Sequence, residues 1–432
     1  MLTIEQLYDV FLRHSVVSTD TRNLPAGCIY FALKGPNFNG NNFALQALEK
    51  GAAFAVIDEE IGDDPRLLRV KDVLTALQEL ATLHRHRLDI HVLAITGSNG
   101  KTTTKELAAA VLRKDFEMHY TQGNLNNHIG VPLTLLQLTE DHDFAVVEMG
   151  ANHQKEIAAL CKIAMPDYGL ITNIGKAHLE GFGGPEGVKK GKGEMYDHIR
   201  SNGEVIFIQL DNPILRDLLH GYDNIITYGT SPGVQYRGAI VNNDSAFLEV
   251  EVISPFRLKI KTQLTGEYNF DNVMAAVAIG GHFGVEPQDI REAIENYVPD
   301  NQRSQVIKKG ALTIVLDAYN ANPSSMQVAI ENFSKHFSGK KIVALGEMLE
   351  LGADGPAEHL RIARQAAASE GELLLVGTLF AEAAKEIGCH HFVDSRQCME
   401  WIKAHQPESG NILIKGSRGA KMEKLLEAFH ES

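Results

Sequence analysis

The chain has 432 residues, of which 44% are hydrophobic and 22% are charged, a balance typical of folded globular proteins and not of disordered ones. Its 41 Lys and Arg against 55 Asp and Glu give a formal net charge of −14, which argues against a general nucleic-acid binder or a protein held at anionic membranes by charge. The four cysteines are scattered, and the apolar runs are far shorter than the roughly 20 residues that cross a bilayer. The N-terminus is acidic and lacks the apolar segment of a signal peptide. These features predict a cytoplasmic protein with no membrane insertion.

Strand and helix patterns divide the chain into three predicted α/β domains. Residues 1–85 predict a small domain, with buried strands in CIYFALKG and AAFAVID and helices at about 43–50 and 72–87. Residues 86–298 alternate apolar strands with helices, which predicts a doubly wound, mostly parallel sheet. Within them, residues 235–262 alternate without a helix and predict appended antiparallel strands. After a linker at 297–300, residues 299–432 predict a Rossmann-like C-terminal domain.

The most informative segment is AITGSNGKTT (94–103), at the end of the first strand of the central part. Glycines permit a tight turn and a helix begins at Lys101, so backbone N–H groups and a helix N-terminus point at an anion. Lys101 can reach the β- and γ-phosphates, and the hydroxyl of Thr102 or Thr103 can ligate Mg²⁺. The general P-loop formula would place its first glycine at Ile95, and a purely structural turn is the alternative. We predict that ATP or GTP binds to Gly97, Ser98, Asn99, Gly100, Lys101, Thr102 and Thr103.

Polar residues follow the next two strands in the same topological place. Glu148 ends the strand FAVVE, and Asn173 and His178 come after YGLITNI. The carboxyl ends of parallel strands form the edge where ligands bind, and Mg²⁺ prefers hard oxygen ligands, so Glu148 is a candidate metal ligand. The alternatives are a surface acid at a strand end and a structural histidine.

Taken together, these segments resemble the Mur ligase family, the ATP-dependent amide ligases of peptidoglycan assembly. The resemblance runs from Asp20 to the final helix. GSNGKTTT marks the superfamily, which includes folylpolyglutamate synthases. The more specific matches are GNLNNHIGVPLTLL (123–136), EMGANH (148–153), TNIGKAHLEGFG (172–183), DAYNANPSSM (317–326), LGEMLELG (345–352) and IKGSRG (414–419). They match the branch that adds D-alanyl-D-alanine (D-Ala-D-Ala) to UDP-N-acetylmuramoyl-tripeptide (UDP-MurNAc-tripeptide), and the DNPR motif of ligases that add meso-diaminopimelate is absent.

The resemblance implies ATP and Mg²⁺ as cofactors and an acyl phosphate as the intermediate. It implies catalytic roles for Lys101, Glu148, His178 and Lys192, and metal binding by Thr102, Glu148, His178 and Lys192, the last as a carbamate. Lys192 has a second interpretation, because Lys189, Lys190 and Lys192 could form a solvated basic face.

For the nucleotide, the resemblance implies base contacts by Asn269 and Asn272, a phosphate contact by Arg303 and a ribose contact by Asp317. Tyr268 stands where the family usually has His, and Leu316 where a first acid is common. Either asparagine could instead cap a helix.

For the substrates, the resemblance implies three groups of contacts, and a monomer is the default expectation. In the N-terminal domain, residues for the UDP end are Ser18, Thr19, Asp20, Arg22, Lys34 and Asn39, although the family's Asp-Gly-His reads Asn39-Gly40-Asn41 here. Residues for the muramoyl peptide are Thr121, Asn124, Asn126 and Asn127. Residues for D-Ala-D-Ala are Asn320, Asn322, Lys415 and Arg418, with Lys415 or Arg418 as the cation for its carboxylate. A ligase for another acceptor and a nucleotide-dependent switch are the alternative functions.

Overall fold

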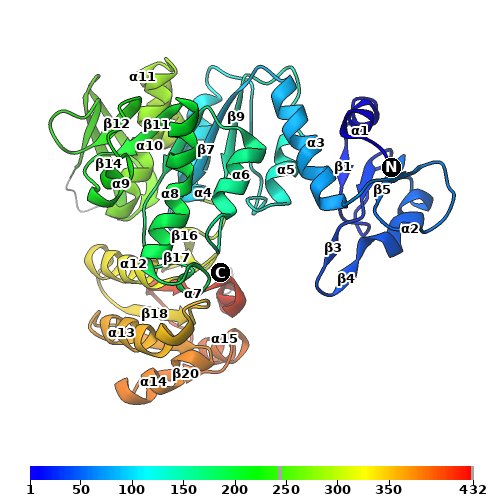
Figure 1. The fold of residues 1–432 in the computed structure, drawn as a ribbon. Coiled ribbons are helices and arrows are strands. Elements are labelled where there is room, and N and C mark those ends of the chain that lie inside the picture. The colour runs from blue at the N-terminus through cyan, green and yellow to red at the C-terminus, as the bar shows by residue number, and fades with distance from the viewer. Residues whose placement is uncertain (242–245, 430–432) are drawn as a thin grey trace.

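The computed structural model describes residues 1–241 and 246–429, in which the chain forms three main β-sheets in succession (Figure 1). The N-terminal sheet has four strands, the central sheet nine and the C-terminal sheet six within these ranges, and no strand is shared between them. The predicted α/β class with three sheets is confirmed. In these same ranges, no helix combines the length and the apolar character needed to cross a membrane.

The N-terminal unit has a parallel sheet of order β1-β2-β5-β6 and a separate hairpin of β3 and β4. Buried strands carry Ile29, Phe31 and Val56 toward the helices, as the apolar runs predicted. The elements are α1 (Ile4–Phe11), β1 (Val17–Ser18), β2 (Ile29–Phe31), β3 (Lys34–Gly35), β4 (Phe38–Asn39), the 3-10 helix η1 (Gly40–Phe43), α2 (Ala44–Glu49), β5 (Phe54–Ile57), β6 (Leu67–Arg69) and α3 (Val73–Arg87).

The central sheet has the order β15-β14-β13-β12-β11-β10-β7-β9-β8. It is parallel from β8 to β13, and β14 and β15 extend the same sheet antiparallel, so the predicted antiparallel strands are confirmed. The elements are β7 (His91–Thr96), α4 (Lys101–Leu112), β8 (Met118–Tyr120), α5 (Gly130–Leu135), β9 (Phe144–Glu148), α6 (Glu156–Ala164), β10 (Tyr168–Ile171), α7 (Leu179–Phe182), α8 (Pro185–Asn202), β11 (Val205–Gln209), α9 (Pro213–Leu218), β12 (Ile225–Gly229), β13 (Tyr236–Ile240), β14 (Phe247–Ser254), β15 (Leu258–Thr265), η2 (Glu267–Asn269), α10 (Phe270–His282) and α11 (Pro287–Glu295).

The C-terminal sheet has the order β16-β17-β21-β18-β19-β20 and is parallel except for β16. Figure 1 shows this unit, in yellow to red, beside α7 and one end of α8. The elements are β16 (Gln305–Lys309), β17 (Leu312–Asp317), α12 (Pro323–His336), β18 (Lys341–Gly346), η3 (Gly352–Asp354), α13 (Gly355–Ala367), β19 (Glu372–Val376), η4 (Thr378–Phe380), α14 (Ala381–Ile387), β20 (His390–Phe392), α15 (Ser395–Ala404), β21 (Gly410–Lys415), η5 (Arg418–Ala420) and η6 (Met422–Ala428).

Helix α3 joins the N-terminal and central units through one continuous apolar core. Its residues Leu77 and Leu80 belong to the same buried cluster as Phe31 of the N-terminal sheet and Val147 of the central sheet. The predicted boundary after residue 85 therefore falls within the last turn of a helix that both units share. Burial of continuous apolar surface stabilises the arrangement of the two units relative to each other.

A buried cation fastens the end of α3 to the central unit. Arg85 donates hydrogen bonds to the carbonyls of Ala164 (3.2 Å) and Met165 (3.2 Å) at the C-terminus of α6, and to the Asp167 carboxylate (2.9 Å). The last carbonyls of a helix lack intrahelical partners and carry partial negative charge, so a guanidinium is well matched to them.

Replacing Arg85 with Met should lower the free energy of unfolding by about 1–3 kcal/mol, because buried acceptors lose their donor. Thermal unfolding followed by circular dichroism measures this change. Arg87→Met is the matched control, since Arg87 is exposed at the end of the same helix. Equal melting temperatures for the two variants would contradict the role of Arg85.

Candidate active site

The segment after β7 forms a tight loop that leads directly into α4, as the sequence predicted. Gly97 (φ 143°) and Gly100 (φ 80°) have backbone conformations that favour glycine. A Cβ at Gly97 would lie 1.9 Å from Thr172 Oγ1, and one at Gly100 would lie 2.5 Å from Asn272 Oδ1. Because Gly100 is the N-cap of α4, the first backbone N–H groups of this helix have no intrahelical acceptors and face the loop.

The segment after β10 supports this phosphate loop from behind. The Ser98 N–H donates to the Asn173 carbonyl (3.0 Å), and the Asn99 N–H donates to Asn173 Oδ1 (3.0 Å). Thr172 Oγ1 donates to the Asn99 carbonyl (2.6 Å). Since β7 and β10 are neighbours in the parallel sheet, the loop lies at the point where the strand order reverses, the usual position of ligands in such sheets.

Lys101 lies at the first position of α4 and folds back over the loop. Its Nζ donates to the Gly97 carbonyl (2.7 Å). Burial, with a contribution from nearby Arg303, lowers the pKa of Lys101 to about 8, and nearby Glu148 opposes this effect. The lysine is therefore mainly charged at pH 7, and an adjacent phosphate would stabilise the charged form further.

Glu148 is a nearly buried carboxylate (2% exposed) at the end of β9. Thr102 Oγ1 donates to its Oε2 (2.9 Å), and Asn126 Nδ2 donates to its Oε1 (2.8 Å). A hydroxyl and a carboxylate beside a phosphate loop are the hard oxygen donors that Mg²⁺ prefers. In the described part of the chain, no three His, Cys, Asp or Glu side chains gather as a metal centre. The Thr102 hydroxyl and the Glu148 carboxylate suit Mg²⁺, which takes few protein ligands and completes its shell with water and phosphate.

The two other predicted metal ligands, His178 and Lys192, contact other groups in this structure. His178 Nδ1 contacts the carboxylate of Glu350, which comes from the C-terminal unit. Lys192 is 1% exposed, so it is not part of a solvated basic face. Its Nζ donates to the Ala151 carbonyl (3.3 Å) and lies 5.3 Å from the centroid of the Phe182 ring. Burial first and the charge of Lys101 second lower the pKa of Lys192 to about 7.

The predicted base contacts form a buried chain of amides next to Gly100 of the phosphate loop. Asn272 Nδ2 donates to Asn269 Oδ1 (2.8 Å), Asn269 Nδ2 donates to the Thr265 carbonyl (2.8 Å), and Thr104 Oγ1 of α4 donates to Asn272 Oδ1 (3.0 Å). Neither asparagine makes a capping hydrogen bond, since Asn272 lies inside α10 and Asn269 caps it without one. The hydroxyl of Tyr268, which replaces the family's usual His, lies 2.6 Å from that of Ser304.

Arg303 and Asp317 approach the nucleotide region from the C-terminal unit. The Arg303 guanidinium lies over the Tyr319 ring at 3.8 Å from its centroid, and its Nε is buried with no hydrogen-bond partner. Asp317 ends β17 and accepts a hydrogen bond from Lys415 Nζ (2.5 Å). Lys415 is 1% exposed and already paired, whereas Arg418 is exposed and lies 5.7 Å from the Tyr319 ring centroid. Of these two cations, Arg418 is the better placed to receive a second carboxylate.

Direct hydrogen bonds connect the C-terminal unit to the phosphate loop and its surroundings. Asn322 caps α12 and donates from Nδ2 to Asn99 Oδ1 (2.7 Å). Lys176 Nζ forms an ion pair with Glu358 (2.7 Å). Asn320, by contrast, is exposed and accepts a hydrogen bond only from the neighbouring Ala321 N–H among the contacts of the described residues.

The predicted peptide-binding residues lie on the loop at 121–127, next to Glu148. Thr121 is fully buried, and its Oγ1 accepts a hydrogen bond from the Glu148 N–H (3.0 Å). Asn127 Oδ1 accepts from the N–H groups of Ile129 and Gly130 at the start of α5. Asn124 and Asn127 are exposed, whereas Asn126 is half-buried because its side chain donates to Glu148.

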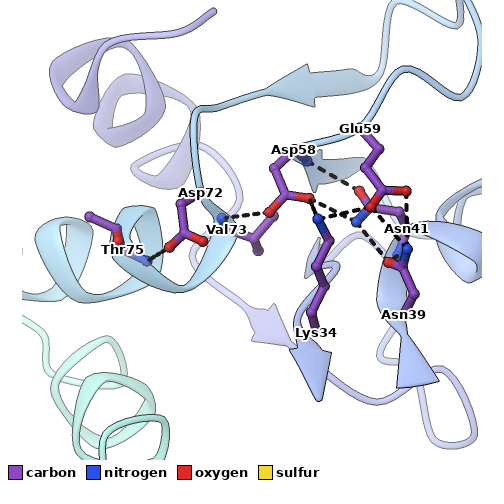
Figure 2. A network of polar contacts seen from close by, with 8 residues as sticks. All are labelled: Lys34, Asn39, Asn41, Asp58, Glu59, Asp72, Val73 and Thr75. Carbon is purple, nitrogen blue, oxygen red and sulfur yellow. Dashed lines mark hydrogen bonds and ion pairs between the residues drawn. The ribbon is translucent and has the colours of Figure 1, made fainter. Parts of the chain in front are cut away.

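In the N-terminal unit, the predicted diphosphate contacts are paired with acids. Figure 2 shows Lys34 between Asp58 (2.9 Å) and Glu59 (2.8 Å), with Asn39 donating to Glu59 (3.0 Å) and Asn41 donating to Asp58 (2.8 Å). Hydrogen bonding to Glu59 and then to Asp58 raises the pKa of Lys34. A diphosphate at Lys34 would therefore have to displace these carboxylates.

The remaining predicted UDP contacts lie at β1 and in the turn that follows it. Ser18 ends β1, and Thr19 follows it. Arg22 is highly exposed and pairs with Asp20 (2.7 Å). Thr104, Asp58 and Glu59 carry no local sequence signal, because the role of each depends on partners that are distant in sequence.

Two family models match the chain: the Mur ligase middle domain over residues 95–280 and the Mur ligase glutamate ligase domain over residues 302–418. The UDP-N-acetylmuramoyl-tripeptide--D-alanyl-D-alanine ligase of Escherichia coli (strain K12) is 35% identical and covers 100% of this chain and 99% of its own length. The chain belongs to the Mur ligase family. The motif-based resemblance is thereby confirmed.

Solved structures of Mur ligases share the same architecture. A crystal structure of MurF from Acinetobacter baumannii matches with a TM-score of 0.88 at 32% identity, over 100% of this chain and 99% of that one. The MurF ligase of Thermotoga maritima, solved in complex with ADP, matches with a TM-score of 0.84 at 27% identity, over 96% of each chain. This Mur ligase is therefore an ATP-dependent acid–amino acid ligase, as the sequence analysis predicted.

Lys101→Met should lower kcat/KM for ATP about 10²–10³-fold, because the loop loses the cation nearest the transferred phosphoryl group.

In the unmodified protein, ATP affinity should fall as the pH rises above about 8, where free Lys101 loses its proton. Calorimetric titration across pH 6.5–9.5 measures this dependence. A Met variant that keeps the same pH dependence would contradict the assignment.

Proposed function

We propose that this Mur ligase joins D-Ala-D-Ala to UDP-MurNAc-tripeptide in peptidoglycan precursor synthesis, with the release of ADP and phosphate. The observation that carries the proposal is the full-length similarity to ligases of that name. The phosphate loop, Glu148 and the cations of the C-terminal unit support it, because they supply the groups that the reaction needs. Action as a cytoplasmic monomer stays a prediction.

The reaction has two steps that share one site. In the first, an oxygen of the peptide carboxylate bonds to the γ-phosphorus of ATP, and ADP leaves. In the second, the amine of D-Ala-D-Ala attacks the acyl carbon, and the tetrahedral intermediate expels phosphate and loses a proton. Two anions must approach each other in the first step, so positive charge at the γ-phosphate lowers the barrier.

Residues of the central unit supply most of that charge and hold the phosphates. The N-terminus of α4 and Lys101 contact the β- and γ-phosphates, while Asn272 and Asn269 orient the base. Mg²⁺, when bound, neutralises phosphate charge, and Thr102, Glu148, His178 and carbamylated Lys192 are its proposed protein ligands. Because Thr102 and Glu148 already contact each other, these two groups are pre-positioned.

The other two units supply substrate binding in this proposal. Residues 1–85 bind the UDP end, residues 86–298 hold ATP and the peptide carboxylate, and residues 299–432 bind D-Ala-D-Ala and close over ATP. Arg303 contacts the phosphates and Asp317 the ribose, while Arg418 receives the dipeptide carboxylate because Lys415 is paired with Asp317. Contacts such as Asn322 to Asn99 hold the units closed.

ADP release measured with each substrate alone and with both together tests the proposed function. We expect sustained ADP release only when UDP-MurNAc-tripeptide and D-Ala-D-Ala are both present, because acyl phosphate accumulates without an amine. A nucleotide-dependent switch would instead hydrolyse ATP with neither substrate. A ligase for another acceptor would release no ADP with this pair.

Lys192 should be carbamylated by CO₂, because its lowered pKa leaves a neutral amine that can attack carbon and release a proton. After trapping with ¹³CO₂, the carbamate carbon signal should decrease as the pH falls below about 7, where the amine becomes protonated. Lys190→Met, on the exposed side of α8, should keep the signal and Lys192→Met should lose it. Persistence of the signal in Lys192→Met would remove Lys192 from the site.

A further inference from the structure

A second lysine on the phosphate-binding helix is completely buried. Lys105 follows Lys101 by one turn of α4, and its side chain has no exposed surface. Its Nζ donates to the Thr121 carbonyl (2.6 Å) and pairs with Glu106 (3.0 Å). Burying an ammonium group is costly unless specific partners compensate for the lost water, so its position calls for an explanation beyond apolar packing.

The acceptor of this hydrogen bond begins the loop at 121–127, which also contacts Glu148. The Thr121 side chain accepts from the Glu148 N–H (3.0 Å). At the other end of the loop, Asn126 Nδ2 donates to the Glu148 carboxylate (2.8 Å), and the Asn126 carbonyl accepts from the Gly150 N–H (2.7 Å). A shift of Thr121 would therefore move both the loop and the backbone of Glu148.

Helix α4 thus contacts three parts of the site with side chains from its first two turns. Thr102 contacts the Glu148 carboxylate, Thr104 contacts the base-side Asn272, and Lys105 contacts the loop. Because a helix is stiff over three turns, these contacts fix the spacing between the phosphates and the loop at 121–127.

We propose that Lys105 is a positioning residue that holds the loop at 121–127 so that the peptide carboxylate of UDP-MurNAc-tripeptide faces the γ-phosphate. This rests on the proposed function and on the expectation that the loop, with Thr121, Asn124, Asn126 and Asn127, contacts the muramoyl peptide. Lys105 itself touches neither substrate, and it acts through Thr121.

The variant Lys105→Met removes the ammonium and keeps an unbranched apolar side chain. KM for UDP-MurNAc-tripeptide should rise about tenfold, as expected when a charged hydrogen bond that orders the loop is lost, and kcat should fall. KM for ATP should stay within about twofold, because the Lys101 and Thr104 contacts remain. The calorimetric Kd for UDP-MurNAc-tripeptide without ATP should weaken in parallel with its KM.

Lys114→Met is the matched control. Lys114 lies just after the C-terminus of the same helix and is paired with Glu292 (3.3 Å), so the kinetic constants of this variant should not change. A Lys105→Met variant with a lower melting temperature and an unchanged KM for UDP-MurNAc-tripeptide would show that Lys105 is only structural, and would overturn the proposal.

A second variant keeps the proposal testable if Lys105→Met fails to fold. Thr121→Val is nearly isosteric and keeps the carbonyl that binds Lys105, but it removes the hydroxyl that accepts from Glu148. It should raise KM for UDP-MurNAc-tripeptide with little change in KM for ATP, and an unchanged KM for UDP-MurNAc-tripeptide overturns the connection through Thr121. Where both variants fold, KM for UDP-MurNAc-tripeptide in the double variant should rise no further than in the more impaired of the two single variants.

The unmodified protein separates this proposal from the proposed function. If it neither binds nor consumes UDP-MurNAc-tripeptide, the proposed function is wrong, and the role of Lys105 falls with it. If it does both while Lys105→Met and Thr121→Val retain the original KM for this substrate, only the role of Lys105 is wrong.

Discussion

The buried carboxylate of Glu148 is the group on which the arrangement of the active site depends. The two carboxylate oxygens accept hydrogen bonds from Thr102 and Asn126, and the backbone N–H of Glu148 donates to Thr121. A negative charge with 2% exposure beside a binding site for phosphate is favourable only with cations close by. Lys101 and the N-terminus of α4 meet that requirement, and under the proposed function Mg²⁺ would add to it.

Neutral hydrogen bonds connect the central and C-terminal units beside this site. Asn99 of the phosphate loop accepts from Asn322, and Tyr268 beside the base site contacts Ser304. Under the proposed function, these bonds bring Arg303 and Asp317 to the nucleotide that the central unit holds. Nucleotide binding and closure would then use the same residues and exclude water where charge develops.

Sequence predicted most of the central site because its signals are local. Glycines before a helix indicate the phosphate loop, and an acid at the end of an apolar strand identifies Glu148. Pairings between distant segments could not be predicted in this way. Lys34 and Lys415 looked like free cations, but Asp58 and Glu59 neutralise the first, and Asp317 neutralises the second because β17 and β21 are neighbours. The antiparallel β16 also gave no distinctive local pattern.

The apolar core that α3 shares with both the N-terminal and central units has a consequence for substrate length. Because Leu77 and Leu80 pack into a cluster that extends across both sheets, the N-terminal and central units keep a fixed separation, whereas polar contacts such as Asn322 to Asn99 connect the C-terminal unit to the phosphate loop. Under the proposed function, the nucleotide end of the substrate is anchored at one end of this rigid frame and its reacting carboxylate at the other. The fixed distance between these two ends would then select precursors by the number of peptide residues that they carry as well as by their chemistry.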